Sequence, residues 1–330
     1  MKLNIVAPVN TESFIKNCMP ASFANQDISL SVNGHESMYD GIVVLQSTRG
    51  YKMPDMKYRS GNSLLMIYEP QDILRISRSY IQQFDYVITP NQKIKGRNTI
   101  NCAFGQMWSI DKTYEQLCSL EPPVNKINKV SAVISTKAIT RGHKKRLDFV
   151  SALKDELGDL FKWYGKGVCE IDDKWEAIYP YRYQLVFENG KWHHYWTEKL
   201  TDAFMGYSMP LYIGCPNLAD YFSQQSYLEL DDTDPKQAAA QIKSAVANNL
   251  YNESVKKIIE ARDLIFNKYG LFPMLSSLIE KYFNLESSSR KTIQFSKFKN
   301  TVHLYYPAKA FKKIRHQLLN NIFLKTKTFQ

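Results

Sequence analysis

The sequence predicts an α/β protein with two domains, each built around a parallel sheet. The chain has 330 residues, which is more than one ordinary hydrophobic core accommodates. Residues 1–118 alternate short apolar segments with helical ones, the pattern of a parallel sheet with crossover helices. Residues 181–213 read as strand, loop, helix and strand, which is a second unit of the same kind. Because 44% of the residues are apolar, the chain is globular rather than disordered.

The first domain is expected over residues 1–122. Its strands are predicted at residues 3–6, 39–45, 63–68 and 84–89, with a helix over residues 73–83. The third of these strands ends at Glu69, which is followed by a proline. Two prolines in the polar stretch 121–128 mark this stretch as the linker to the second domain.

The second domain is expected over residues 123–270. A strand at 130–135 leads into a basic run, 141–146, which is followed by a helix. The central strand, 181–187, alternates apolar and polar residues and therefore predicts a half-buried strand. After a turn and an aromatic loop, Thr197 is the expected N-cap of a helix that ends at Gly206. The free amides at the start of such a helix suit a diphosphate.

The remaining chain, residues 271–330, is expected to form C-terminal helices and a basic tail. A helix is predicted to begin at Pro235, and a later one at 272–284 is a candidate to cross back to the first domain. The net charge of +11 is concentrated in the tail, since ten Lys and Arg residues and no acidic residue follow Glu286. A basic amphipathic helix around 311–322 predicts contact with an anionic membrane surface. The alternative is a terminal helix packed on the first domain with exposed lysines.

Cysteine usage and apolar runs indicate a cytoplasmic protein. The five cysteines are an odd number without a C-x-x-C pair, so we expect them to be reduced and structural. The N-terminal apolar run is too short for a signal peptide, and no run reaches the length of a membrane span. With the basic tail, the expected location is the cytoplasm, peripheral to the inner face of the membrane.

One stretch carries a family resemblance with its spacing intact over residues 181–222. Its matching residues are Phe187-Glu188-Asn189, Tyr195, Thr197-Glu198-Lys199-Leu200, Pro210-Leu211-Tyr212-Ile213-Gly214, Pro216 and Phe222. In this order they resemble the C-terminal signature of glycosyltransferase family 10, the α-1,3/4-fucosyltransferases. The resemblance implies a GT-B fold, in which two Rossmann-like domains face a cleft. The first would be the acceptor-side domain, the second would bind the nucleotide sugar, and the basic tail would be membrane-proximal.

The resemblance also implies which residues bind the donor. Asn189 and Tyr195 would line its pocket, and Glu198 would accept hydrogen bonds from sugar or ribose hydroxyls. Lys199 would neutralise the departing diphosphate. Arg146 occupies the position of an arginine that pairs with the diphosphate, for which a guanidinium is better suited than a lysine.

Two further positions follow from the same resemblance. Gly165, in a Y-G-x-x turn, would let the backbone approach the nucleotide. Glu69 would be the general base that takes the acceptor proton, so the predicted catalytic residues are Glu69 and Glu198. The match at Glu69 is loose, because the family has one residue between the glutamate and the proline. A solvated strand-end glutamate is the alternative for Glu69.

The function implied is an inverting α-1,3-fucosyltransferase that moves fucose from GDP-fucose to a GlcNAc- or glucose-type acceptor, in a surface glycan such as lipopolysaccharide. No cofactor and no obligatory metal are expected, since no D-x-D pattern lies in a plausible site. Gly190 and the loop 191–194 depart from the family pattern, so another GDP-6-deoxysugar donor remains an alternative. His193 and His194 in this loop are adjacent and lack ligand spacing, so we expect no metal site there.

Two alternatives from other classes stay open. A nucleic-acid-binding protein would use the basic tail, but the charge is terminal rather than on an aromatic platform, so we expect no nucleic-acid partner. A catalytically inactive glycan-binding protein is the other, against which the retention of Arg146, Glu198 and Lys199 argues.

Overall fold

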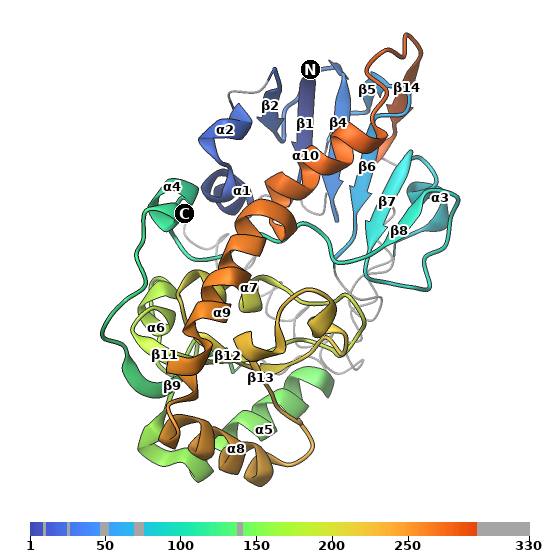
Figure 1. Ribbon diagram of the computed structural model, residues 1–330. Coiled ribbons are helices and arrows are strands. Elements are labelled where there is room, and N and C mark those ends of the chain that lie inside the picture. The colour runs from blue at the N-terminus through green and yellow to red at the C-terminus, as the bar shows by residue number, and fades with distance from the viewer. Residues whose placement is uncertain (9–10, 25–26, 47–52, 69–75, 137–140, 296–330) are drawn as a thin grey trace, which may run out of the picture.

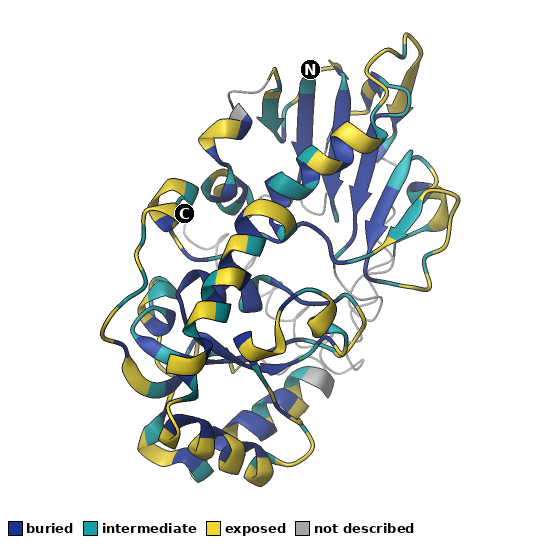
Figure 2. Cartoon of the chain, in the orientation of Figure 1, coloured by how far each residue is buried: buried dark blue, intermediate teal, exposed yellow. Residues whose placement is uncertain are grey.

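The structure is a computed structural model that describes residues 1–8, 11–24, 27–46, 53–68, 76–136 and 141–295 (Figure 1). It contains two separate parallel sheets, one in each half of the chain, with helices packed around them. The predicted α/β class with two Rossmann-like domains is therefore confirmed. Central strands of both sheets are buried, and the outer surfaces of the helices are exposed (Figure 2).

The first sheet has six parallel strands in the order β2-β1-β4-β6-β7-β8. Its strands are β1 (Lys2–Val6), β2 (Ser29–Val32), β4 (Gly41–Leu45), β6 (Ser63–Met66), β7 (Tyr86–Thr89) and β8 (Thr99–Asn101). The four predicted strands are its four central strands. The two edge strands, β2 and β8, were not predicted, because their residues are only partly buried and carry little apolar signal.

The predicted strand 39–45 is two strands in the structure. Gly41–Leu45 is β4, whereas β3 (Met38–Tyr39) pairs with β5 (Met56–Arg59) in a small second layer. The chain turns at Asp40, whose carboxylate accepts the Lys2 backbone N–H at 2.8 Å and the Arg59 guanidinium at 2.9 Å. The bonds to Asp40 hold this turn between the two layers.

The helices of the first domain are short: α1 (Glu12–Cys18), α2 (Ala21–Ala24), α3 (Arg78–Ile81) and α4 (Tyr114–Cys118). The predicted extent of a helix over 73–83 is wrong in its described part. The helix starts only at Arg78, because Ser77 caps it by accepting the Tyr80 N–H, and the chain leaves it at Gln82. Residues 69–75, which include Glu69, lie outside the described residues.

The second sheet has five parallel strands in the order β10-β9-β11-β12-β13. They are β9 (Ile127–Val133), β10 (Phe161–Tyr164), β11 (Tyr181–Phe187), β12 (Met209–Ile213) and β13 (Leu228–Glu229). The prediction that β11 is half-buried is wrong, because the strand lies between β9 and β12 and is covered on both faces. Its polar Gln184 is buried as well and accepts a hydrogen bond from the Ser131 hydroxyl at 2.6 Å.

Five helices accompany this sheet: α5 (Arg141–Leu157), α6 (Trp175–Ile178), α7 (Glu198–Met205), α8 (Pro235–Ala247) and α9 (Leu250–Leu264). Short 3-10 turns occupy Gly158–Leu160, Leu218–Asp220 and Gln224–Ser226. The helix α5 begins at Arg141, so the basic run 141–146 forms its first turns instead of preceding it. As predicted, Thr197 is the N-cap of α7 and Gly206 its C-cap.

The chain returns to the first domain after α9. A π-helical turn (Ile265–Tyr269) leads into α10 (Leu271–Tyr282), which runs along the first sheet (Figure 1). Phe272 packs edge-on against Phe23 at 4.8 Å between ring centroids, and the Asn284 N–H donates to the Asn62 side chain at 2.6 Å. The predicted crossing helix is thereby confirmed.

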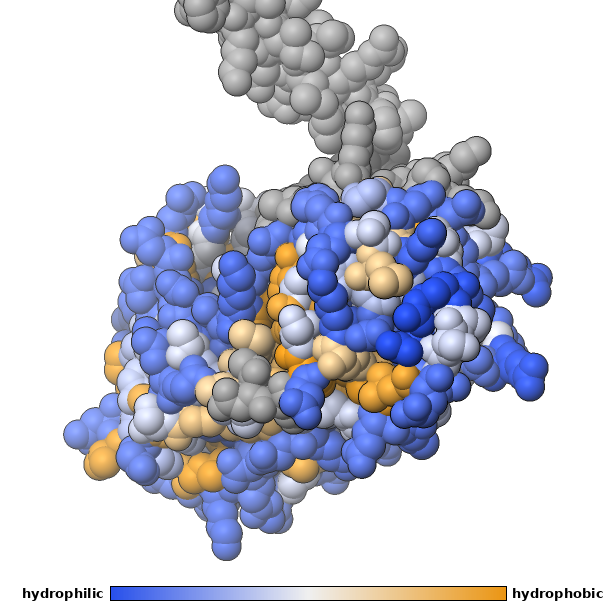
Figure 3. All heavy atoms as spheres, turned by 90° about the horizontal axis from the view of Figure 1, so that it is seen from above, coloured by the Kyte–Doolittle hydropathy of each residue, from blue (hydrophilic) through white to orange (hydrophobic). Residues whose placement is uncertain are grey.

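The last described strand corrects the start of the predicted tail. Arg290–Ile293 is β14, which pairs antiparallel with β5 of the first domain. Lys291 also forms an ion pair of 2.6 Å with Asp85. Arg290 and Lys291, two of the basic residues after Glu286, therefore belong to this strand, and the amphipathic helix predicted around 311–322 lies outside the described residues. Seen from above, the molecular surface is mostly hydrophilic, with apolar side chains gathered toward the middle (Figure 3).

In the part of the chain that the structure describes, no helix is both long enough and apolar enough to cross a membrane.

Candidate active site

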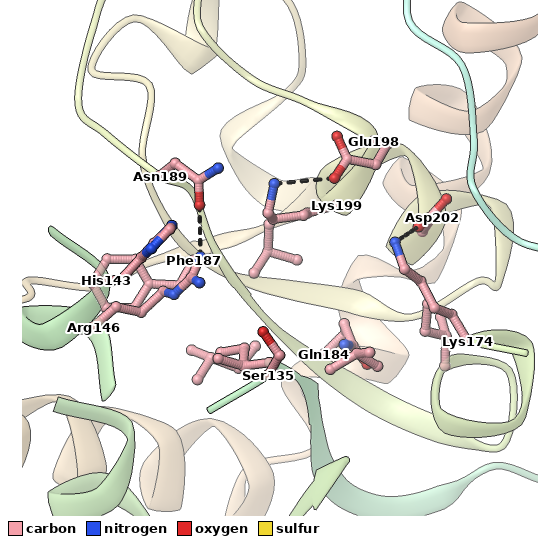
Figure 4. A pocket seen from close by; sticks show the side chains of 15 residues that line it. Ser135, His143, Arg146, Lys174, Gln184, Phe187, Asn189, Glu198, Lys199 and Asp202 are labelled. Atoms are coloured by element: carbon pink, nitrogen blue, oxygen red, sulfur yellow. Dashed lines mark hydrogen bonds and ion pairs between the residues drawn. The ribbon is translucent and has the colours of Figure 1, made fainter. Parts of the chain in front are cut away.

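A cavity of about 280 Å³ lies at the carboxyl ends of β9 and β11. β9 has β10 on one side and β11 on the other, so the connections of the sheet change direction between β9 and β11. Ligands of open parallel sheets bind at such a switch point, because loops from both directions part there. The cavity is lined by Val133, Ile134, Ser135, His143, Arg146, Lys174, Ile178, Gln184, Leu185, Val186, Phe187, Asn189, Glu198, Lys199 and Asp202 (Figure 4).

Arg146 projects from α5 to one wall of this cavity. Its Nη1 donates a 2.7 Å hydrogen bond to Oδ1 of Asn189, directly after β11 (Figure 4). Its Nε has no hydrogen-bond partner among the described residues, although the side chain is only 9% exposed. Burial lowers the pKa of Arg146, and the negative charge of Glu188 opposes that shift. An arginine stays charged in any case, so it presents a buried cation with an unused donor.

The N-terminus of α7 forms a second wall and is anchored by Glu188. The carboxylate of Glu188 accepts from the Thr197 N–H at 2.8 Å and from the Thr197 hydroxyl at 2.7 Å. That hydroxyl in turn accepts from Lys199 Nζ at 3.0 Å, so its proton is directed at Glu188. Glu188 is only 3% exposed, and burial raises its pKa. A buried acid, not only the capping threonine, thus fixes the direction of α7.

Lys199 and Glu198 form an ion pair at the start of α7. Lys199 Nζ lies 3.1 Å from Glu198 Oε1 and 3.5 Å from Glu188 Oε2. Burial alone would lower the pKa of Lys199, but Glu198 and Glu188 outweigh it and raise this pKa. Burial would also raise the pKa of Glu198, but Lys199 and Lys174 outweigh it, and the pKa falls to about 2. Both groups are therefore charged at neutral pH.

A second ion pair lies across the cavity from Arg146 (Figure 4). Lys174 Nζ, just before α6, is 3.0 Å from Oδ2 of Asp202 on α7. Burial raises the pKa of Asp202, and Lys174 opposes this shift. Asp202 also accepts two hydrogen bonds from Ser109 of the first domain. Neither the pairing nor the cavity position of Lys174 has a local signal in the sequence, since its partners are 28 and 65 residues away.

The structure brings four of the residues implied by the resemblance to one cavity: Arg146, Asn189, Glu198 and Lys199. Tyr195 and Gly165 are near but do not line it. The buried Tyr195 acts electrostatically on Arg146. Gly165 has φ +129°, and a Cβ there would lie 2.8 Å from the Ile134 backbone, so only glycine lets this turn rest against the cavity wall. Glu69 lies outside the described residues.

The basic run divides between the cavity and the surface. Arg146 and His143 line the cavity, whereas Lys145 forms a surface ion pair of 2.9 Å with Asp232. Asp232 also pairs with Lys191 at 2.7 Å and so ties the aromatic loop to α5. Lys145 therefore lies next to Arg146 in the sequence but points to the surface, where it pairs with Asp232.

The loop that departs from the family pattern is organised by Trp192. A Cβ at Gly190 would lie 1.6 Å from Cζ3 of Trp192, so the indole occupies the space that a larger residue at 190 would need. Trp192 is 37% exposed and packs edge-on against Tyr195 at 5.4 Å. In the same loop, His194 Nδ1 lies 2.6 Å from the Tyr221 hydroxyl.

The cavity can bind an anionic ligand. Arg146 and Lys199 approach it from α5 and α7, and the N-terminus of α7 adds the positive end of the helix dipole. Glu198 offers acceptors for hydroxyl groups, whereas the oxygens of Asp202 are engaged by Ser109 and Lys174. Cations together with a hydrogen-bond acceptor suit a phosphorylated ligand with a sugar part.

Comparison with known proteins agrees with this arrangement. Residues 124–254 match the model of the glycosyltransferase family 10 (fucosyltransferase) C-terminal region. The α-(1,3)-fucosyltransferase FucT of Helicobacter pylori is 34% identical over 62 residues, which are 19% of this chain and 13% of that protein. The matched part thus spans a small fraction of the curated relative.

Solved structures with a similar architecture have low sequence identity. A crystal structure of an α1,3-fucosyltransferase with GDP is 16% identical, covers 82% of this chain and 92% of its own, and gives a TM-score of 0.49. A glycosyltransferase from Rickettsia africae is 12% identical with coverages of 87% and 99% and a TM-score of 0.49. The fold itself follows from the two parallel sheets and the returning helix α10. Residues 124–254 therefore resemble the C-terminal region of family 10 glycosyltransferases, within a chain of two α/β domains.

Proposed function

We propose that this chain is an inverting α-1,3-fucosyltransferase that transfers fucose from GDP-fucose to a GlcNAc- or glucose-type acceptor, in a surface glycan such as lipopolysaccharide. The observation that carries the proposal is the convergence of Arg146, Lys199 and the N-terminus of α7 on one cavity at the switch point of the second sheet. A nucleoside diphosphate matches this combination of two cations and the positive end of a helix dipole. The family match and the name of the H. pylori relative support fucose as the transferred sugar.

In this reaction the acceptor oxygen attacks the anomeric carbon while the bond to the diphosphate breaks. Negative charge grows on the leaving diphosphate, and fixed cations stabilise that charge without reorganisation. Arg146 and Lys199 have this role. Glu198 has a pKa of about 2, so it is a poor general base at neutral pH and serves as an acceptor for donor hydroxyls. The acceptor proton goes to a separate base, for which Glu69 remains the hypothesis.

The test is binding of nucleotides to the purified protein, followed by thermal unfolding and calorimetry. GDP and GDP-fucose should raise the melting temperature, because a ligand of the native state stabilises it by mass action, whereas UDP and UDP-glucose should not. A lack of response to every nucleotide would contradict the proposal.

Substitution at Arg146 makes this test specific. Arg146→Lys keeps the charge but loses the planar fork, so GDP affinity should fall by about 10- to 100-fold. The matched control is Lys145→Ala, one residue away, whose partner is Asp232 on the surface. If both variants bound GDP equally well, the cavity would not be the diphosphate site.

A second candidate is the same reaction with another GDP-6-deoxysugar. Gly190 and the indole of Trp192 favour it, because they change the surface beside the donor cavity. Binding of GDP together with failure to bind GDP-fucose would select this candidate and exclude fucose.

We also propose that the enzyme acts at the inner face of a membrane, through the basic tail, without an obligatory metal. Vesicles with anionic lipid should bind the full chain more strongly than vesicles of neutral lipid, and salt should weaken that binding. Transfer should persist after treatment with EDTA. Loss of transfer on chelation, restored by a divalent ion, would contradict the metal-free mechanism.

A further inference from the structure

One contact joins the first domain directly to the wall of the donor cavity. Asp202 of α7 accepts the Ser109 backbone N–H at 2.7 Å through Oδ1 and the Ser109 hydroxyl at 2.8 Å through Oδ2. Ser109 lies between β8 and α4, in the first domain. Asp202 is only 1% exposed, so these hydrogen bonds are shielded from water and are costly to break.

Lys174 completes this contact from a third element. Its Nζ pairs with Asp202 Oδ2 at 3.0 Å and also donates to the Ser109 hydroxyl. Lys174 and Asp202 both line the cavity. Lys174 further lowers the pKa of Glu198, one turn before Asp202 on α7. The positive charge of Lys174 therefore acts both on the contact with the first domain and on Glu198, the acid proposed to bind the donor.

Other contacts of the same first-domain segment are made away from the cavity. The Ala103 N–H donates to the Tyr221 hydroxyl at 3.1 Å, and Gln106 bonds to the backbone of Tyr269 at 2.9 Å. The Asp111 N–H donates to Asp173 Oδ1 at 3.1 Å. None of these partners in the second domain lines the cavity. These contacts hold the two domains together, but none of them reaches the donor cavity.

We propose that Ser109, Asp202 and Lys174 form a positioning cluster. The cluster fixes the position of the first domain relative to the donor cavity, so that the acceptor lies in the correct place to attack the donor. This inference rests on the proposed function. The donor is held mainly by α5, β11 and the start of α7, so the cluster contributes little to donor affinity. Transfer depends on it, because misplacement of reacting groups by about 1 Å costs up to about 100-fold in rate.

Asp202→Asn tests the cluster with almost no change in shape. The asparagine keeps one acceptor oxygen but turns an NH2 group toward either Ser109 or Lys174, both of which are donors. We expect kcat at saturating substrates to fall by about tenfold or more, and the dissociation constant of GDP to change by less than about threefold. Amide hydrogen exchange in residues 107–111 should speed up by about fivefold or more, since a neutral amide with one acceptor oxygen holds Ser109 more weakly than the carboxylate does.

Asp173→Asn is the matched control. Asp173 contacts the same first-domain segment, but its Oδ1 alone accepts both the Asp111 and Trp175 N–H groups, and asparagine keeps that oxygen. We expect this variant to match wild type in kcat and in exchange. Should Asp202→Asn fail to fold, Ser109→Ala removes the hydroxyl but leaves the Asp202–Lys174 pair, and its kcat should fall by about threefold or more.

The results separate this inference from the proposed function. If Asp202→Asn kept the kcat and the amide exchange of wild type, the proposed role of the cluster would be refuted. It would also be refuted by a tenfold loss of GDP affinity with unchanged exchange, because Asp202 would then be a ligand of the donor. If the wild-type protein bound no nucleotide, the proposed function would fail and the coupling with it. That outcome is read from wild type alone, so it cannot be mistaken for a failure of the variant.

Discussion

Glu188 offers a test of the site that requires no substrate. Replacing it with glutamine removes one of two acceptor oxygens in a place where Thr197 supplies two donors at 2.8 and 2.7 Å. One charge-assisted hydrogen bond, about 1.5–3 kcal/mol, is lost, and the new amide faces a donor that stays unpaired. Lys199 also loses its buried partner at 3.5 Å and keeps only Glu198. We expect Glu188→Gln to lower the free energy of unfolding by about 2–4 kcal/mol.

The assay is urea denaturation, in which the midpoint should fall while the slope is unchanged, because the exposed surface is the same. Glu229→Gln is the control, since Glu229 lies exposed in β13 and its replacement should cost less than about 0.5 kcal/mol. If Glu188→Gln unfolded within about 0.5 kcal/mol of wild type, the anchoring of α7 by Glu188 would be refuted.

Two further predictions concern charge and the aromatic loop. The pKa of Glu198, about 2 when folded against a usual 4.5, means that its stabilising contribution is full above pH 4.5 and is lost as the pH falls toward 2. In Glu198→Gln the urea midpoint should therefore drop less between pH 5 and pH 3 than it does in wild type. An equal drop in both proteins would contradict this prediction. Gly190→Ser should cost about 1 kcal/mol, because its Cβ meets the Trp192 indole, and close to nothing in a Trp192→Ala background. Equal costs in both backgrounds would show that the indole is not what restricts position 190.

The sequence was most informative where structure is determined locally. The unit β11-α7-β12 was predicted with its cap at Thr197 and its end at Gly206, because caps and apolar periodicity depend on neighbouring residues. The four central strands of the first sheet were found for the same reason. The helix expected over 73–83 failed because Ser77 competes for the helix start. Apolar spacing cannot show such competition.

Long-range pairing was beyond the reach of the sequence. Ser109 and Asp202 are separated by 93 residues, and no periodicity links them. Glu188 sits inside the recognised signature, but a strand-end acid has the same pattern whether it is solvated or, as here, buried under a helix N-terminus. The small layer of β3, β5 and β14 joins three distant segments of weak apolar character. Such features depend on which surfaces meet, not on local preference.

The return of α10 and β14 has a consequence for the order in which the protein is made. The second domain is inserted into the first, since the chain leaves after α4 and comes back only at Leu271. During synthesis the inserted domain is complete while the first still lacks the helix that covers its sheet and the strand beside β5. Domains generally fold as units as they emerge. The half of the molecule that is translated first is therefore the half that finishes folding last.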